Sequence, residues 1–173
     1  MQSIEKGGAV QNIIKLNDFQ KELKNISDKN YYFFLIGFTL GLTFKETMQL
    51  NKKETQNIIK KRKEEIIKKD NLEKINEFLT DYNENEYLFS DFEKKYLTFK
   101  KTAEEVDINN FGNETMQRSF AFFHYQYYQD VDRTKNLLNL VSPTATLHYM
   151  GYDEDRYICF YCNRGCIYRK KYK

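Results

Sequence analysis

The chain has 173 residues, of which 40% are hydrophobic and 16% aromatic, so it can bury the core of one domain and is not disordered throughout. One proline and seven glycines argue against a loop-rich or all-β fold, and the net charge of +3 does not by itself identify a nucleic-acid-binding protein. No apolar run reaches the ~18–20 residues that span a bilayer, and nothing resembles a secretory signal. We therefore expect a cytoplasmic protein.

The first third of the chain is predicted to be helical. Residues 1–12 are expected to be a flexible lead-in, and apolar residues then recur at helical spacing over 16–26, with Asn17 or Asp18 as the cap. A second helix is predicted from Asp28 to about Leu40. It is apolar almost all round, which places it at the centre of the core.

The next segment changes character. Thr43 and Glu46 have the spacing of a capping box, which predicts a short third helix. Residues 57–69 contain two short β-prone stretches around a charged centre and predict a β-hairpin, with a charged helix as the alternative.

Helical periodicity returns after the predicted hairpin. Helices are expected near residues 72–82, 98–106 and 116–127, and apolar residues at 137–141 mark a further one. Ser142-Pro143 is typical of a cap followed by proline at the first helical position. The predicted fold is mainly α with a small β-hairpin, in one domain covering residues 13–158.

Residues 159–173 are expected to form a basic tail rich in cysteine and tyrosine. Cys159, Cys162 and Cys166 have the spacing C-x₂-C-x₃-C, but a zinc site needs a fourth ligand and none is evident. We therefore predict no metal and no cofactor. A zinc ion completed by His124 or His148 is the alternative, and packing of the tail on the domain explains the segment equally well.

Three segments, in order, resemble the catalytic domain of the tyrosine recombinases, the phage integrase family. They are GFTLGLTFKETMQL (37–50), GNETMQRSFAFFH (112–124) and LLNLVSPTATLHYMG (137–151). In the family these positions hold a Gly-Leu-Arg turn, a His-x-x-Arg motif and the segment that leads to the nucleophilic tyrosine. The resemblance covers roughly residues 10–155. It implies the recombinase fold, double-stranded DNA as partner, and a tail that docks on a second protomer of a homodimer.

The resemblance also implies which catalytic groups are missing. The family's first arginine, its His-x-x-Arg pair and its later histidine fall on Thr43, Glu114, Gln117 and Leu140, and only Tyr149 is retained. Arg118 lies one residue along the helix, about 100° around the axis, and is expected to point elsewhere. Because losing one charge-stabilising group typically costs about 10²–10³ in rate, the sequence predicts a protein that is not an enzyme.

The predicted function is therefore non-catalytic DNA binding, as a transcriptional regulator or repressor, or as an accessory factor, of a prophage or other mobile element. The residues expected at the DNA are Thr43, Lys45, Lys60, Lys61, Arg62, Lys63, Gln117, Arg118 and Tyr149. Lysines would hold the phosphate backbone, while Gln117 and Arg118 are residue types that read base edges.

Three simpler or rival interpretations stay open at this point. The lysines can form an ordinary solvated surface, and Tyr149 an ordinary packed tyrosine. A divergent active recombinase would use Tyr149 with cations recruited from elsewhere in the chain. A protein-interaction module that no longer binds DNA would use neither.

Overall fold

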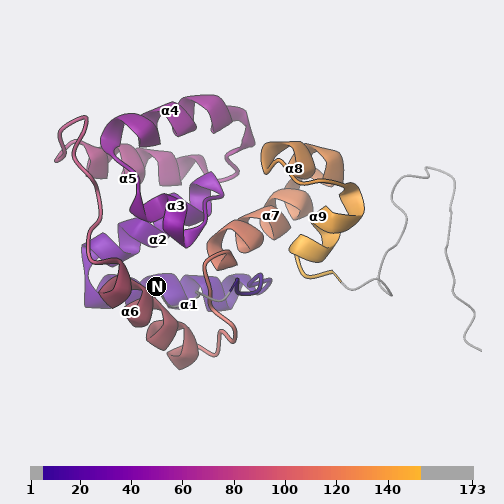
Figure 1. Cartoon of the computed structure of the whole chain (residues 1–173), viewed down its shortest axis with the longest axis horizontal. Helices are drawn as coiled ribbons and strands as arrows, with labels where there is room; N and C mark the ends of the chain where they lie inside the picture. Colours follow the sequence, from indigo (N-terminus) through magenta and orange to yellow (C-terminus); the bar gives the residue numbers. More distant parts are fainter. Residues whose placement is uncertain (1–5, 153–173) are drawn as a thin grey trace, which may run out of the picture.

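The computed structural model describes residues 6–152, and Figure 1 shows that this part of the chain is built from helices. They are α1 (Ile13–Ile26), α2 (Asp28–Leu40), α3 (Phe44–Met48), α4 (Lys52–Arg62), α5 (Lys69–Leu79), α6 (Phe92–Glu105), α7 (Thr115–Tyr128), α8 (Val131–Leu137) and α9 (Pro143–Tyr149), with a short 3₁₀ helix, η1 (Lys63–Glu65). Within the described residues, β-type pairing is limited to an isolated bridge between Asn51 and Tyr87. The fold is mainly helical, as predicted.

Helix α2 is the centre of the core. It contacts α1, α3, α4, α5 and α7, and most of its side chains are buried. The Ser27 side chain caps its first turn by accepting a hydrogen bond from the Asn30 amide, at 3.2 Å. The predicted helix from Asp28 to Leu40 is confirmed, because a segment that is apolar on all sides is stable only when surrounded by other helices.

Aromatic rings fill the space between α2, α3 and α6. Phe44, the first residue of α3, is fully buried; its ring centroid lies 4.5 Å from that of Phe33 and 5.4 Å from that of Phe99. The Thr43–Glu46 capping box that begins α3 is confirmed. The cap therefore fixes the turn that inserts Phe44 into the core.

A Phe44→Ala substitution should destabilise the fold by about 3–5 kcal/mol, because it removes a buried ring whose neighbours cannot collapse into the cavity. Urea denaturation followed by circular dichroism would measure the loss. Leu97→Ala, at a position on α6 that is 66% exposed, is the matched control and should change stability by less than about 0.5 kcal/mol. Equal losses in the two variants would contradict this picture of the core.

The predicted β-hairpin over residues 57–69 is wrong. The segment continues α4 to Arg62 and then forms η1, because Asn51 and Glu54 form a complete capping box that starts a helix there. Ile58 and Ile59 pack against the core from one side of that helix, and Lys60 and Lys61 lie on the exposed side. The helical alternative is the correct one.

Helices α8 and α9 form a smaller unit beside α7, at the right of Figure 1. Its apolar centre consists of Ala121, Tyr125, Val131 and Met150, separate from the main core. The helix expected at 137–141 is wrong, since α8 ends at Leu137 and Val141 is 96% exposed. The helix beginning at Ser142-Pro143 is confirmed, with the Ser142 hydroxyl accepting from the Ala145 amide at 3.1 Å. This unit carries Tyr149.

The lead-in assigned to residues 1–12 is anchored over its described part. The Val10 amide donates to Ser119 Oγ at 2.8 Å, and the Glu114 amide donates to the Lys6 carbonyl at 2.7 Å. The tail at 159–173, with its three cysteines, lies outside the described residues. Over residues 6–152, no cluster of three or more His, Cys, Asp or Glu side chains has a geometry that would hold a metal, and no helix has the length and apolarity needed to cross a membrane.

Candidate functional site

Tyr149, at the last position of α9, meets two side chains of α7. Its hydroxyl donates to Gln117 Oε1 at 2.5 Å, and the Arg118 guanidinium carbon lies 4.4 Å from the centroid of its ring. Arg118 Nη1 also donates to the Tyr149 carbonyl, at 3.4 Å. A cation over the face of a tyrosine ring is attracted by the ring quadrupole. Tyr149 is therefore held between two neighbouring residues of α7.

The expectation that Arg118 points away from Tyr149 is wrong. A helical wheel gives the direction in which a side chain leaves its own helix, whereas α9 packs close enough to α7 for the long guanidinium side chain to reach Tyr149. Arg118 is steered there by Glu114, whose Oε2 accepts from Nε at 3.0 Å and from Nη2 at 2.8 Å. The i,i+4 spacing of Glu114 and Arg118 is the signal in the sequence from which this ion pair could have been predicted.

A second arginine approaches from α4. Arg62 Nη1 donates to the carbonyls of Leu40 and Gly41, and Gln117 Nε2 donates to the same Gly41 carbonyl at 3.1 Å. A continuous hydrogen-bonded path thus runs from Arg62 through Gly41 and Gln117 to Tyr149. We call Arg62, Glu114, Gln117, Arg118 and Tyr149 the tyrosine site.

Gly41 makes this path possible. It ends α2 in the left-handed conformation, with φ of 64°, and a Cβ there would lie 2.5 Å from the ring of Phe120. Both facts require glycine. The tight turn presents the carbonyl of Gly41 to both Arg62 and Gln117.

Thr43 has a structural role in this arrangement. Its hydroxyl donates to Glu46 Oε2 at 2.8 Å and accepts from the Glu46 amide at 3.2 Å, which completes the cap of α3. The position that resembles the family's first arginine is thus occupied by a capping residue. Arg62, at the end of α4, supplies a guanidinium beside the turn at Gly41.

Burial, assisted by two neighbouring carboxylates, keeps the phenol of Tyr149 neutral. Burial raises its pKa well above the usual value, and the Glu114 and Glu46 carboxylates raise it further, while Arg118 opposes them. Burial also lowers the pKa of the Arg62 guanidinium. A neutral phenol is a weak nucleophile, so any attack by Tyr149 requires its proton to leave as the new bond forms.

The remaining residues expected at DNA lie outside the tyrosine site. Lys60, Lys61 and Lys63 are exposed around the end of α4, and Lys45 is exposed on α3. Lysines in the last turn of a helix also stabilise its carbonyl end, so their position has a structural explanation as well. Lys60, Lys61 and Lys63 together place positive charge on the solvent side of α4, the helix that carries Arg62.

A cluster of titratable residues around the buried His124, which the sequence did not reveal, connects η1 to α7 and α8. His124 is fully buried; its Nε2 lies 2.9 Å from Glu65 Oε2 and its Nδ1 lies 2.8 Å from Thr134 Oγ1. Arg133 Nε donates to Glu65 Oε2 at 2.7 Å, and its guanidinium stacks on Tyr128. His124 is engaged in holding the segment after Arg62 against α7 and α8.

Protonation of this cluster should destabilise the fold. Burial lowers the pKa of His124, and although burial alone would raise the pKa of Glu65, hydrogen bonds from Arg133 and His124 lower it. The stability contributed by a neutral buried histidine is present above its unfolded pKa of about 6.5 and is lost as the pH falls through its lower folded pKa. Glu65 adds a second loss, at pH below about 4.3.

We expect the free energy of unfolding to decrease between pH 7.5 and pH 5.5, as measured by urea titration at a series of pH values. His124→Gln should flatten this slope, whatever its effect on absolute stability. His148→Gln removes the other histidine, which is exposed, and should leave the slope in place. A slope that survives in His124→Gln and disappears in His148→Gln would contradict the assignment.

The chain is similar to the probable integrase/recombinase YoeC of Bacillus subtilis (strain 168), with 25% identity over 163 residues, which is 84% of this chain and 90% of that protein. This similarity supports an integrase/recombinase-like relationship. No protein-family model matches the chain, and no solved structure gives a significant match.

The similarity to YoeC corrects one prediction made from the sequence. The prediction that the protein is not an enzyme is contradicted, because the relative of this integrase-like chain bears the name of an enzyme class. That prediction rested on the loss of the arginines from the sequence motifs. In the structure, Arg118 and Arg62 lie at the site, at positions where the motifs place no arginine.

Proposed function

We propose that this protein binds double-stranded DNA and that Tyr149 is the nucleophile of a recombinase-type strand-transfer site. The observation that carries the proposal is the convergence of Arg118, Gln117 and Arg62 on the tyrosine and its neighbouring loop, from elements distant in sequence. The similarity to a probable integrase/recombinase supports the same reaction class.

The reaction needs groups that this site contains. A bond forms between Tyr149 Oη and the phosphorus of a phosphodiester, the bond from phosphorus to one deoxyribose oxygen breaks, and the phenolic proton passes to the departing oxygen. Negative charge accumulates on the phosphate oxygens, where guanidinium groups stabilise it. Arg118 lies over the ring of the phenol, and Arg62 borders the same loop.

Arg118 and Tyr149 are both engaged by neighbouring side chains of the site, and bound DNA would replace these contacts. Arg118 is paired with Glu114, and the phenol is hydrogen-bonded to Gln117. A phosphate is a stronger bidentate partner for arginine than a single carboxylate oxygen is, so it would displace Glu114 from Arg118. The Tyr149 hydroxyl would also have to leave Gln117 Oε1 in order to reach a phosphate.

Duplex binding would use the exposed lysines at the end of α4 together with the tyrosine site. Lys60, Lys61 and Lys63 neutralise phosphates without reading sequence. Repression of transcription, or an accessory role in recombination on a mobile element, would use this same face.

The binding experiment compares two triple variants that change the net charge equally. Reversal of Lys60, Lys61 and Lys63 to glutamate should weaken binding to a duplex at low salt by at least about tenfold. It should also reduce the salt slope by about one for each phosphate that is no longer neutralised. The control reverses Lys21, Lys94 and Lys101, which are exposed on α1 and α6, away from α4 (Figure 1).

Equal losses of affinity in the two triple variants would show that only overall charge matters, and would overturn the assignment of this face. Absence of any affinity at low salt in the unaltered protein would overturn DNA binding itself and favour the hypothesis of a protein-interaction module.

A further inference from the structure

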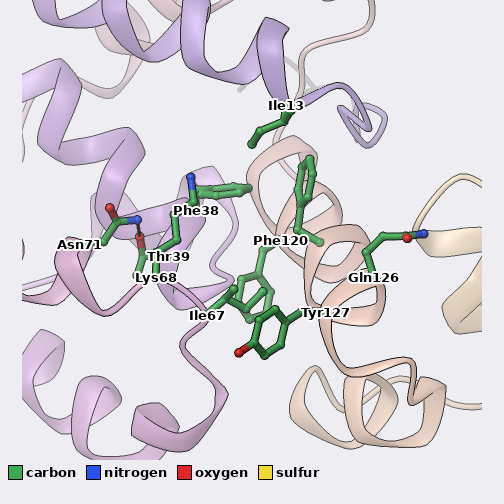
Figure 2. Close-up of a pocket in the computed structure, with 10 residues that line it drawn as sticks. Ile13, Phe38, Thr39, Ile67, Lys68, Asn71, Phe120, Gln126 and Tyr127 are labelled. Carbon is green, nitrogen blue, oxygen red and sulfur yellow. Dashed lines mark hydrogen bonds between the residues drawn. The ribbon is translucent and has the colours of Figure 1, made fainter.

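An apolar cavity of about 270 Å³ lies between α1, α2, α7 and the chain that enters α5. Figure 2 shows that the lining residues come from these separate elements and that most of the labelled side chains face a common space, whereas Gln126 points away from it. Phe38, Phe120 and Phe123 supply aromatic walls, and Ile13 and Ile67 supply aliphatic ones. Small-molecule sites are commonly lined by hydrophobic and aromatic side chains, as this cavity is.

The lining of the cavity is almost entirely apolar, and polar groups stand only at one edge of it. Asn71 Nδ2 donates to Thr39 Oγ1 at 3.0 Å, and Lys68 lies beside them (Figure 2). These groups stand at the edge of an otherwise apolar wall, so a ligand with one polar end would enter in a single orientation.

A second hollow, of about 510 Å³, begins at this polar edge. It shares Ile67, Lys68 and Asn71 with the apolar cavity, and its other side chains include Lys69, Lys74 and Asp70. Three lysines against one aspartate give this hollow an excess of positive charge. The two hollows are therefore neighbours, one apolar and one cationic, with Ile67, Lys68 and Asn71 lining both.

We propose that this pair of hollows binds a small anionic amphiphile, with an aliphatic or aromatic body in the apolar cavity and a carboxylate or phosphate beside Lys68 and Lys69. The apolar cavity measures about 270 Å³. A medium-chain fatty acid fits this size and charge. The inference concerns ligand binding alone and is independent of the proposed DNA chemistry.

The complementarity of charge selects this class of occupant. A neutral apolar molecule would leave the lysine side of the site unused, and a cationic amphiphile would be repelled there. An anion is the ligand that uses both hollows.

The test uses the full-length chain and three probes of equal length: decanoate, decanol and decyltrimethylammonium, each below its micelle concentration. Isothermal titration calorimetry should give saturable binding of one decanoate per chain. Decanol should bind at least about tenfold more weakly, because it lacks a charge-assisted hydrogen bond to lysine, and the cation should not bind.

Two variants locate the binding site. Lys68→Met with Lys69→Met should reduce the preference for decanoate over decanol, and Lys94→Met with Lys101→Met is the matched surface control. Phe123→Trp should fill the apolar cavity and remove binding of both probes; if this variant does not fold, the lysine pair still decides the question.

Three results would overturn the proposal. The first is the absence of decanoate binding to the full-length chain, which includes the case in which residues 153–173 fill the cavity. The second is equal affinity for decanoate and the cation. The third is a preference for decanoate over decanol that does not change when Lys68 and Lys69 are replaced.

Discussion

A Tyr149→Phe variant should form no covalent protein–DNA adduct, whereas the unaltered protein should form one on a nicked duplex that prevents religation. The phenol oxygen is the atom proposed to attack phosphorus, and phenylalanine removes that atom while keeping the ring that stacks against Arg118. Because the target sequence is unknown, the substrate is a pool of nicked duplexes with a randomised centre. Adducts are detected by denaturing gel electrophoresis and the bound DNA is sequenced.

Tyr152→Phe is the control for this experiment. Tyr152 belongs to the same small cluster around α8 and α9 and contacts Gln126, but it has no part in the tyrosine site. Its variant should retain the adduct. An adduct that survives in Tyr149→Phe would assign the attack to another residue, and the lack of an adduct with every member of the pool would contradict strand transfer.

The second large effect is expected from Arg118→Ala, which should reduce the rate of adduct formation by about 10²–10³, the usual cost of removing one group that stabilises transition-state charge. Tyr149 loses its neighbouring cation in this variant, and the phosphate loses a bidentate partner. The rate is measured in single-turnover experiments with a duplex selected from the pool.

Glu114→Gln separates this role from a structural one. It removes the carboxylate that occupies Arg118, so it should raise adduct formation or DNA affinity by about fivefold, the effect of deleting roughly 1 kcal/mol of charge repulsion in a water-like medium. If Arg118 only supported the fold, both variants would lower the rate together. Opposite changes in the two variants are the signature of competition between Glu114 and phosphate.

Local sequence signals predicted the helices whose ends carry their own caps. The Thr43–Glu46 capping box and the Ser142-Pro143 start each satisfy backbone amides with side chains a few residues away, so they act wherever the helix is placed. The same kind of signal at Asn51 and Glu54 contradicts the predicted hairpin, and it outweighs the β propensity of the isoleucines that follow.

The tyrosine site was predictable only in part. The order and spacing of three motifs placed Tyr149, Gln117 and Thr43 near one another, and Gln117 does meet Tyr149. Arg62 and Arg118 were expected at the DNA but not beside Tyr149, because the family motifs place their arginines at other positions. A guanidinium on a long side chain can reach one place from several elements, and the direction in which α4 and α9 approach α7 is not encoded locally.

By itself, the sequence determined that this chain folds into helices around an aromatic core, because composition and helical periodicity are properties of the chain alone. The resemblance of its three motifs to a known family also placed Tyr149 at the position of the family's nucleophile, although the sequence predicted it to be a vestige without catalytic function. The tertiary structure alone decided that Arg118 covers Tyr149, that Arg62 joins it through Gly41 and Gln117, and that His124 is buried against Glu65. These are contacts between elements that meet only in the folded chain. They depend on how helices pack, and packing is set by the whole core rather than by any one segment.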